Sequence, residues 1–231
     1  MSDYFLPFLM LVRPRHAADR LPFVVAWWRP FAVVAILAMG LGLLSHPLAV
    51  SIAVSHLPPS ATADDAGQVR RWLDAGLVSR TLLLPLRTAV ECGFSALLLL
   101  AFSRAFTGRP AGSFRGFFVL SLAASVFLLL GRAVAAGWHW IANDGIPSSP
   151  GMILSAAHLF PSVGDYGVIL LLTSINLFTL LYLGSVTLGL AVLCRCNAQK
   201  AFLVAVAAWT VSTAFSITVL FLLRNAYQIR F

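Results

Sequence analysis

Five long apolar stretches constrain this chain more than any other feature of its sequence. Each is longer than the roughly 20 residues that a helix needs to cross the hydrocarbon core of a bilayer. Lipid offers no hydrogen-bond partner to the backbone, so a crossing segment must satisfy its own backbone groups, as a helix does. The sequence therefore predicts an all-α, polytopic membrane helical bundle with five transmembrane helices. The predicted spans cover residues 30–56, 82–106, 116–141, 166–193 and 201–223.

The chain divides into two predicted regions around these spans. Residues 1–29 form an N-terminal segment, and residues 30–231 form the five-span membrane domain. The N-terminal segment has a short apolar run, residues 4–12, followed by three arginines. Apolar residues beside arginines whose charged ends reach water are typical of a segment that lies in the membrane interface. Within the membrane domain, residues 68–80 have the apolar spacing of an amphipathic helix that leads into the second span.

Membrane topology explains the basic excess of the chain, which carries 16 Lys and Arg against 8 Asp and Glu. In a soluble protein this net charge of +8 would indicate nucleic-acid binding, but only 10% of the residues are charged and 60% are hydrophobic. In the five-span arrangement nine bases fall on the side of the N-terminus, five on the opposite side and two within spans. The positive-inside rule then predicts a cytoplasmic N-terminus and a C-terminus outside. We expect the lipid bilayer, and not nucleic acid, as the partner of this charge.

Ionisable side chains are few within the predicted spans, and they lie at similar depth. Glu91 is the only acidic residue in a span, and Arg87 and Arg132 are the only bases. At about 1.5 Å of rise per residue, Glu91 and Arg132 each lie roughly 13 Å from the outer end of their span. Because consecutive spans joined by a short loop pack antiparallel, these two side chains are predicted to face each other as an ion pair. Arg87 lies one turn shallower, where it can pair with Glu91 or extend outward.

Each remaining span contributes one polar residue to the same layer. These residues are His46, Asn176 and Thr213, each roughly 15 Å from the outer surface by the same rise. Two interpretations stay open, because such a network can fix the register of the helices or serve transport or a proton relay. A single carboxylate offers no second acidic site, which favours the structural interpretation. The predicted intramembrane polar core consists of Glu91, Arg132, Arg87, His46, Asn176 and Thr213.

No pattern in the sequence indicates catalysis or cofactor binding. There is no Ser/His/Asp arrangement, phosphate-binding glycine loop or pair of carboxylates with catalytic spacing. The three cysteines, Cys92, Cys194 and Cys196, form no disulfide framework, and the Cys-x-Cys pair has no nearby histidine to complete a metal site. We therefore expect a protein that is not an enzyme and that holds no cofactor or metal.

Short motifs precede, begin or lie within the last three spans. They read Phe-Thr-Gly-Arg-Pro-Ala-Gly-Ser-Phe-Arg-Gly-Phe-Phe over residues 106–118, Ser-Ile-Asn-Leu-Phe-Thr over 174–179, and Cys-Asn-Ala-Gln-Lys-Ala-Phe over 196–202. In order and spacing they resemble the glycine-rich turn, the Asp-Leu-Phe motif and the Ser-x-x-Lys-Ala turn of the Yip family of membrane proteins. The approach to the first span, Trp28-Arg-Pro30, is also similar, so the resemblance covers nearly the whole chain. The residues at the motif positions are Gly108, Gly112, Phe114, Arg115, Asn176, Phe178, Lys200 and Ala201.

This resemblance implies a five-span arrangement with a cytoplasmic N-terminus. The family is named for interaction with Rab-type (Ypt) GTPases; its bacterial members resemble accessory membrane proteins, some of them linked with ABC-type exporters. Arginine supplies 15 of the 16 bases here, which favours a bacterial member. The chain departs from the family pattern at Asn176, where the family has Asp, and after Gly108, where extra residues loosen the turn.

We therefore expect a multi-pass protein of the bacterial inner membrane that acts as an adaptor or accessory subunit. Its partner is expected to be another membrane protein or a second copy of this chain. The alternative is a small transporter or lipid-handling protein that uses the polar layer around Glu91 and Arg132. A membrane enzyme ranks third, because the sequence offers no nucleophile or metal cluster.

Overall fold

Helices make up the regular structure of the residues described in the computed structural model, apart from one isolated β-bridge. This is the all-α class expected from the sequence. The described residues are 3–24, 26–55, 57, 62–107, 112–142, 155–159 and 166–228. The α-helices are α1 (Leu6–Val12), α2 (Pro14–Arg20), α3 (Trp28–Leu44), α4 (His46–Ser55), α5 (Ala63–Ala75), α6 (Leu77–Thr107), α7 (Phe114–Ala142), α8 (Tyr166–Ser174), α9 (Leu177–Leu193) and α10 (Ala198–Gln228). Short 3-10 helices cover Asp3–Phe5 (η1), Leu21–Phe23 (η2) and Ala156–Leu159 (η3).

Three of the described helices are long and apolar enough to cross a membrane. They are α6, over Leu77–Phe106, α7, over Phe114–Trp138, and α10, over Ala198–Val219. They correspond to the second, third and fifth spans expected from the sequence. The helix α6 begins five residues before the expected boundary and keeps Pro85 inside it.

The first expected span, residues 30–56, is divided into α3 and α4 at Ser45. Pro47 lies at the second position of α4. A proline has no N–H to continue the helical hydrogen bonds, and its ring clashes with the carbonyl four residues earlier. This physical conflict explains why α3 ends at Leu44, after 17 residues, instead of continuing through the expected range.

The fourth expected span, residues 166–193, is divided into α8 and α9 at Ile175 and Asn176. Asn176 has the extended backbone of a helix N-cap, and its side chain accepts a hydrogen bond from the backbone N–H of Thr179. Ser155 pairs with Asn176 in the isolated β-bridge, and the N–H of Ala156 donates to the carbonyl of Ile175 at 2.8 Å. A segment between α7 and α8 thus supplies backbone partners where the helix is broken.

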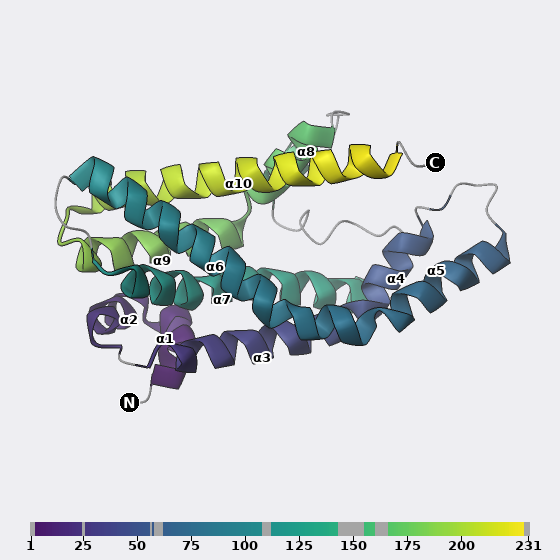
Figure 1. Ribbon diagram of the computed structural model, residues 1–231, viewed down its shortest axis with the longest axis horizontal. Coiled ribbons are helices and arrows are strands. Elements are labelled where there is room, and N and C mark those ends of the chain that lie inside the picture. The colour runs from purple at the N-terminus through teal and green to yellow at the C-terminus, as the bar shows by residue number, and fades with distance from the viewer. Residues whose placement is uncertain are drawn as a thin grey trace.

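Four helices, α6, α7, α9 and α10, form a closed ring in which each packs against the next, and α10 packs against α6. The helix α3 packs outside this ring against α6 and α7. Figure 1 shows these five helices running along the long axis of the molecule, with α1 and α2 at one end. The N-terminus lies at that end, and the last turns of α10 lie at the other.

The N-terminal segment is packed onto one end of the ring. Its helix α1 contacts α7, and α2 contacts α9. Met10, Ala17 and Ala18 are fully buried in the main hydrophobic core. The Arg115 guanidinium at the start of α7 donates to the carbonyl of Val24 at 2.9 Å and ties down the end of the segment. One side of the predicted interfacial segment is therefore a packing surface for the bundle, while Val12 and other apolar side chains remain exposed.

Close packing of α9 against α7 depends on two glycines. A Cβ at Gly189 would collide with Leu120 of α7 and would lie 3.0 Å from Leu21. A Cβ at Gly131 of α7 would lie 2.8 Å from the ring of Phe178 on α9. Small residues at such crossings let two membrane helices approach closely.

The amphipathic helix expected over residues 68–80 is met in part by α5, which begins at Ala63 and ends at Ala75; residues 77–80 belong to α6, which begins after Gly76. A reciprocal capping box between Thr62 and Asp65 begins it. Hydrogen bonds from the Thr62 backbone N–H, and then from its hydroxyl, hold the pKa of the Asp65 carboxyl below its usual value. Leu73 is buried, and α5 packs against α4.

Candidate intramembrane binding site

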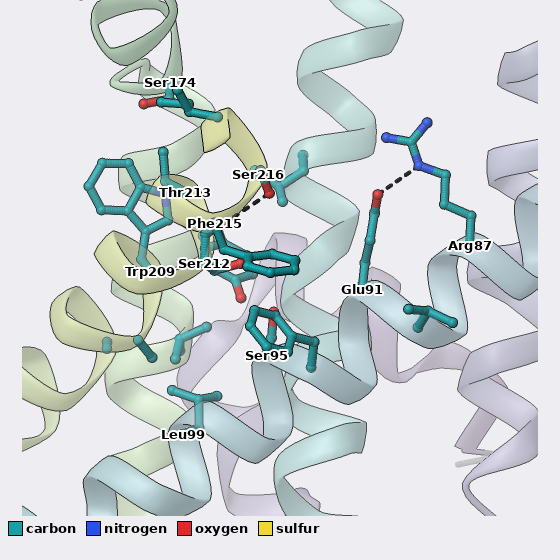
Figure 2. Close-up of a pocket in the computed structure, with 18 of the residues that line it drawn as sticks. Arg87, Glu91, Ser95, Leu99, Ser174, Trp209, Ser212, Thr213, Phe215 and Ser216 are labelled. Atoms are coloured by element: carbon teal, nitrogen blue, oxygen red, sulfur yellow. Dashed lines mark hydrogen bonds and ion pairs between the residues drawn. The ribbon is translucent and has the colours of Figure 1, made fainter. Parts of the chain in front are cut away.

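The ring of helices lines a cavity of about 650 Å³, called here the main cavity, which is partly open to the outside. Helices α6 and α10 supply most of its wall, and α7, α8 and α9 supply the rest. Figure 2 shows the side chains of α6 and α10 facing each other across it. The volume falls in the range of roughly 300–1,000 Å³ that is typical of small-molecule sites.

One end of the main cavity carries charge. The Nε of Arg87 donates to Oε1 of Glu91 at 2.7 Å, between residues four apart on α6 (Figure 2). Both side chains keep more than half of their surface exposed, at 64% and 52%. This end of the cavity is therefore accessible from outside the ring.

Arg132 of α7 also lines the main cavity, but it does not form the expected ion pair with Glu91. Among the described residues no acidic oxygen lies within 4.0 Å of the Arg132 guanidinium. Glu91 instead pairs with Arg87, because a partner one turn away on the same helix needs no particular rotation of α7. Glu91 and Arg132, predicted to lie at equal depth, line the same cavity but do not form an ion pair.

Arg132 lines a second cavity as well. This space of about 280 Å³, called the second cavity, lies between α3, α4, α6 and α7 and is lined by Gly42, Ser45 and Leu84 among others. Arg132 is thus a wall residue of two cavities, one inside the ring and one between the ring and α3.

Residues of α10 and α8 that carry hydroxyl groups also line the main cavity. Thr213 and Ser216 line the main cavity on α10, and Ser174 lines it from the last turn of α8 (Figure 2). The hydroxyl of Ser216 donates to the carbonyl of Ser212 at 2.9 Å, and that of Ser174 donates to Leu171 at 2.6 Å. Each hydroxyl oxygen can still accept a hydrogen bond from a ligand or water.

The opposite end of the main cavity is apolar. Leu99, Val186, Ala205 and Ala208 line it, and all four are at most 5% exposed. Leu99 lies eight residues along α6 from Glu91, which is roughly 12 Å of helix. The main cavity therefore has charged and apolar ends separated along the helix axis.

Two predicted members of the polar core lie elsewhere. The Nε2 of His46 lies 2.8 Å from Oδ1 of Asp74 on α5, beside a groove of about 520 Å³ between α4 and α5. Asn176 caps α9 and does not line the main cavity. The prediction placed both residues in the polar layer by depth alone. Both residues lie at helix breaks, where His46 pairs with Asp74 and Asn176 caps its own helix.

Several lining residues were missed by sequence reasoning. On α10 they are Phe215, Ile217 and one stripe of residues that also contains Thr213, namely Ala205, Ala208, Trp209, Ser212 and Ser216. Their separations of three and four residues are the helical pattern that could have found them. The signal was weak because serine, alanine and tryptophan occur on both lipid-facing and buried surfaces of membrane helices.

The family-motif residues fall mainly at packing positions. Phe178 packs beside Gly131, and Ala201 is fully buried. The Arg115 guanidinium donates a hydrogen bond to the carbonyl of Val24. The backbone N–H of Lys200 donates to Oδ1 of Asn197 at 2.9 Å, at the start of α10. Phe114 is the first residue of α7, Gly112 lies two residues before it, and Gly108 lies outside the described residues.

The described residues contain no cluster of three or more His, Cys, Asp or Glu side chains that could hold a metal ion. Searches with protein-family models, among curated proteins and among solved structures found no match to this chain. The site therefore rests on its own geometry.

Proposed function

We propose that this protein is an integral membrane protein that crosses the bilayer five times, with its N-terminus in the cytoplasm. The helices α6, α7 and α10 supply three crossings, and α3 with α4 and α8 with α9 supply the other two. An odd number of crossings agrees with the ends of the chain lying at opposite ends of the bundle (Figure 1). Exposed bases at the end near α1 support the orientation, namely Arg13, Arg15, Arg104, Arg195 and Lys200.

Within this topology, the function that the geometry favours is binding of an amphipathic molecule in the main cavity, for handling or transport of that molecule. The observation that carries this proposal is one cavity with charge at one end and an apolar wall at the other. A cavity that served only to fix helix register would be filled by side chains, because protein interiors pack to high density. Ionisable residues within membrane helices commonly mark the path or site of a ligand.

Filling the apolar end tests this proposal. Ala208 lines the main cavity and is 5% exposed, whereas Ala214 lies on the exposed side of the same helix. We expect Ala208→Phe to lower the amount of lipid or other amphiphile that co-purifies in mild detergent, measured by native mass spectrometry. Ala214→Phe is the matched control and should leave it unchanged. Equal loading of the two variants would refute the proposal.

An adaptor or accessory role of the Yip type is the second candidate. The observation that favours it is the exposed basic end of the bundle. The N-terminal helices α1 and α2 pack at this end, against α7 and α9. Such a surface suits an acidic protein partner or anionic lipid. Replacing Arg13 and Arg15 by glutamine should remove a stoichiometric protein partner from the purified complex under this candidate. Retention of the amphiphile in the same preparation would separate the two roles.

A further inference from the structure

Arg132 is a cation that has no carboxylate partner among the described residues. The described residues contain three ion pairs, and none includes this side chain. Arginine within a membrane helix normally pairs with an anion, a carbonyl or water. Since Glu91 is held by Arg87, no carboxylate of the described residues is paired with Arg132, and its guanidinium is available to an added anion.

The charge balance of the main cavity points the same way. Its ionisable side chains are Arg87, Glu91 and Arg132, which sum to one net positive charge. The hydroxyls of Thr213 and Ser216 add polar groups opposite α6 (Figure 2). A guanidinium that lines the same cavity as hydroxyl groups suits a carboxylate or phosphate, whose oxygens accept several hydrogen bonds from arginine at once.

The shape of the main cavity limits the remainder of the ligand. Along α6 the wall passes from Glu91 through Phe94 and Ser95 to the apolar Leu99, roughly 12 Å away. At that depth Val186 and Ala205 close the wall with side chains that are 1% and 2% exposed. A ligand that satisfies both ends has a charged head and an apolar tail.

We propose that the main cavity binds a small amphiphile with one anionic head group, with the head held by Arg132 and the tail between α6, α9 and α10. This inference rests on the proposed function and names its ligand class. The Arg87–Glu91 pair lies beside the head group, where Glu91 repels it and Arg87 is neutralised. Carboxylate and phosphate heads share the chemistry that Arg132 recognises.

Direct binding measurements on the purified, detergent-solubilised protein test the ligand class. Labelled dodecanoate is the probe, and dodecyl phosphate, dodecanol and dodecyltrimethylammonium are the competitors. We expect both anions to compete at least tenfold more strongly than the alcohol or the cation. Comparison of the two anions identifies the preferred head group.

Three variants assign this preference to residues. Arg132→Gln should weaken dodecanoate binding at least tenfold and leave dodecanol binding within twofold. Glu91→Gln removes the repelling carboxylate and frees Arg87, so it should tighten dodecanoate binding. Arg104→Gln removes an exposed arginine at the far end of α6 and is the matched control. Should Arg132→Gln fail to fold, the absence of any tightening in Glu91→Gln would still count against an anionic head group at this end of the main cavity.

The outcomes separate the two proposals. If dodecanol binds as tightly as dodecanoate and Ala208→Phe blocks both, the anion specificity is wrong and the amphiphile-binding function stands. If no probe binds and Ala208→Phe leaves the co-purified lipid unchanged, both are wrong. If the anion preference persists in Arg132→Gln, the head group is held elsewhere and this inference is overturned.

Discussion

The side chain of Asn176 forms hydrogen bonds to both helices at the break between α8 and α9. The free energy of unfolding that is lost when this side chain is removed can be worked out from those bonds. Its Oδ1 accepts hydrogen bonds from the backbone N–H of Thr179 at 2.9 Å and from the Thr179 hydroxyl at 3.3 Å. Its Nδ2 donates to the carbonyl of Thr173 at 3.1 Å. The substitution Asn176→Ala removes all three hydrogen bonds.

The expected loss follows from which groups can find another partner. The Thr179 hydroxyl can rotate to a carbonyl of its own helix, but the Thr179 N–H and the Thr173 carbonyl are fixed by the backbone. Thr179 is only 5% exposed. A lost N-cap costs typically about 1 kcal/mol, and a buried group left without a partner costs about 1–3 kcal/mol. We expect Asn176→Ala to lower the free energy of unfolding by about 2–3 kcal/mol.

A second asparagine cap provides the control. Asn197 accepts from the backbone N–H of Lys200 at the start of α10, but it is exposed. Water can replace this cap, so Asn197→Ala should cost about 0.5–1 kcal/mol. Asn176→Asp keeps the accepting oxygen beside the positive end of α9 and should lose less than Asn176→Ala.

Reversible unfolding in mixed micelles of mild detergent and dodecyl sulfate measures these differences. Equal losses for Asn176→Ala and Asn197→Ala would show that water reaches the break as freely as it reaches the start of α10. That result would refute the argument that this break lies in a water-poor part of the bundle.

Three further predictions address packing, the contact between α4 and α5, and a buried thiol. Gly189→Ala should lower the free energy of unfolding by about 1–2 kcal/mol, because a Cβ there crowds two buried leucines and this outweighs the better helix propensity of alanine. A Cβ at Gly184 meets open space, so Gly184→Ala should raise the free energy of unfolding slightly. Equal effects of the two substitutions in the same unfolding assay would contradict this. A double-mutant cycle of His46→Ala and Asp74→Ala should give a coupling energy of about 0.3–1 kcal/mol, and zero coupling would show that the pair does not stabilise the contact. Burial raises the pKa of the Cys194 thiol, so in a variant with the other cysteines replaced by serine its alkylation rate should still be rising above the pH at which an ordinary thiol levels off.

The long helices were predictable from the sequence because apolar length alone specifies them. The expected spans over 82–106, 116–141 and 201–223 correspond to α6, α7 and α10. The spans over 30–56 and 166–193 appeared just as apolar, but they contain Pro47 and Asn176. Hydropathy averaged over a whole span does not reveal a single residue that interrupts the helical hydrogen bonds.

The sequence predicted how far along each helix the site residues lie, but not the side of the helix from which each side chain projects. Counting residues along each helix placed Glu91, Arg132 and Thr213 at one level, and all three line the main cavity. The same count says nothing about the direction in which a side chain leaves its helix. His46 therefore reaches α5, and Asn176 turns to the start of its own helix.

The arrangement of the breaks suggests that the polar layer is organised around Arg132 and not around Glu91. Ser45, at the break between α3 and α4, lines the second cavity, and Ser174, beside the break between α8 and α9, lines the main cavity. Broken helices leave backbone groups that the membrane interior tolerates only against protein or a polar cavity. Arg132 lines both of these cavities, so each break lies beside a space that the same guanidinium makes polar. Pro47 and the Asn176 cap account for the breaks themselves. Arg132 is the charged residue that the two adjoining cavities share, whereas the Arg87–Glu91 pair is complete on one helix.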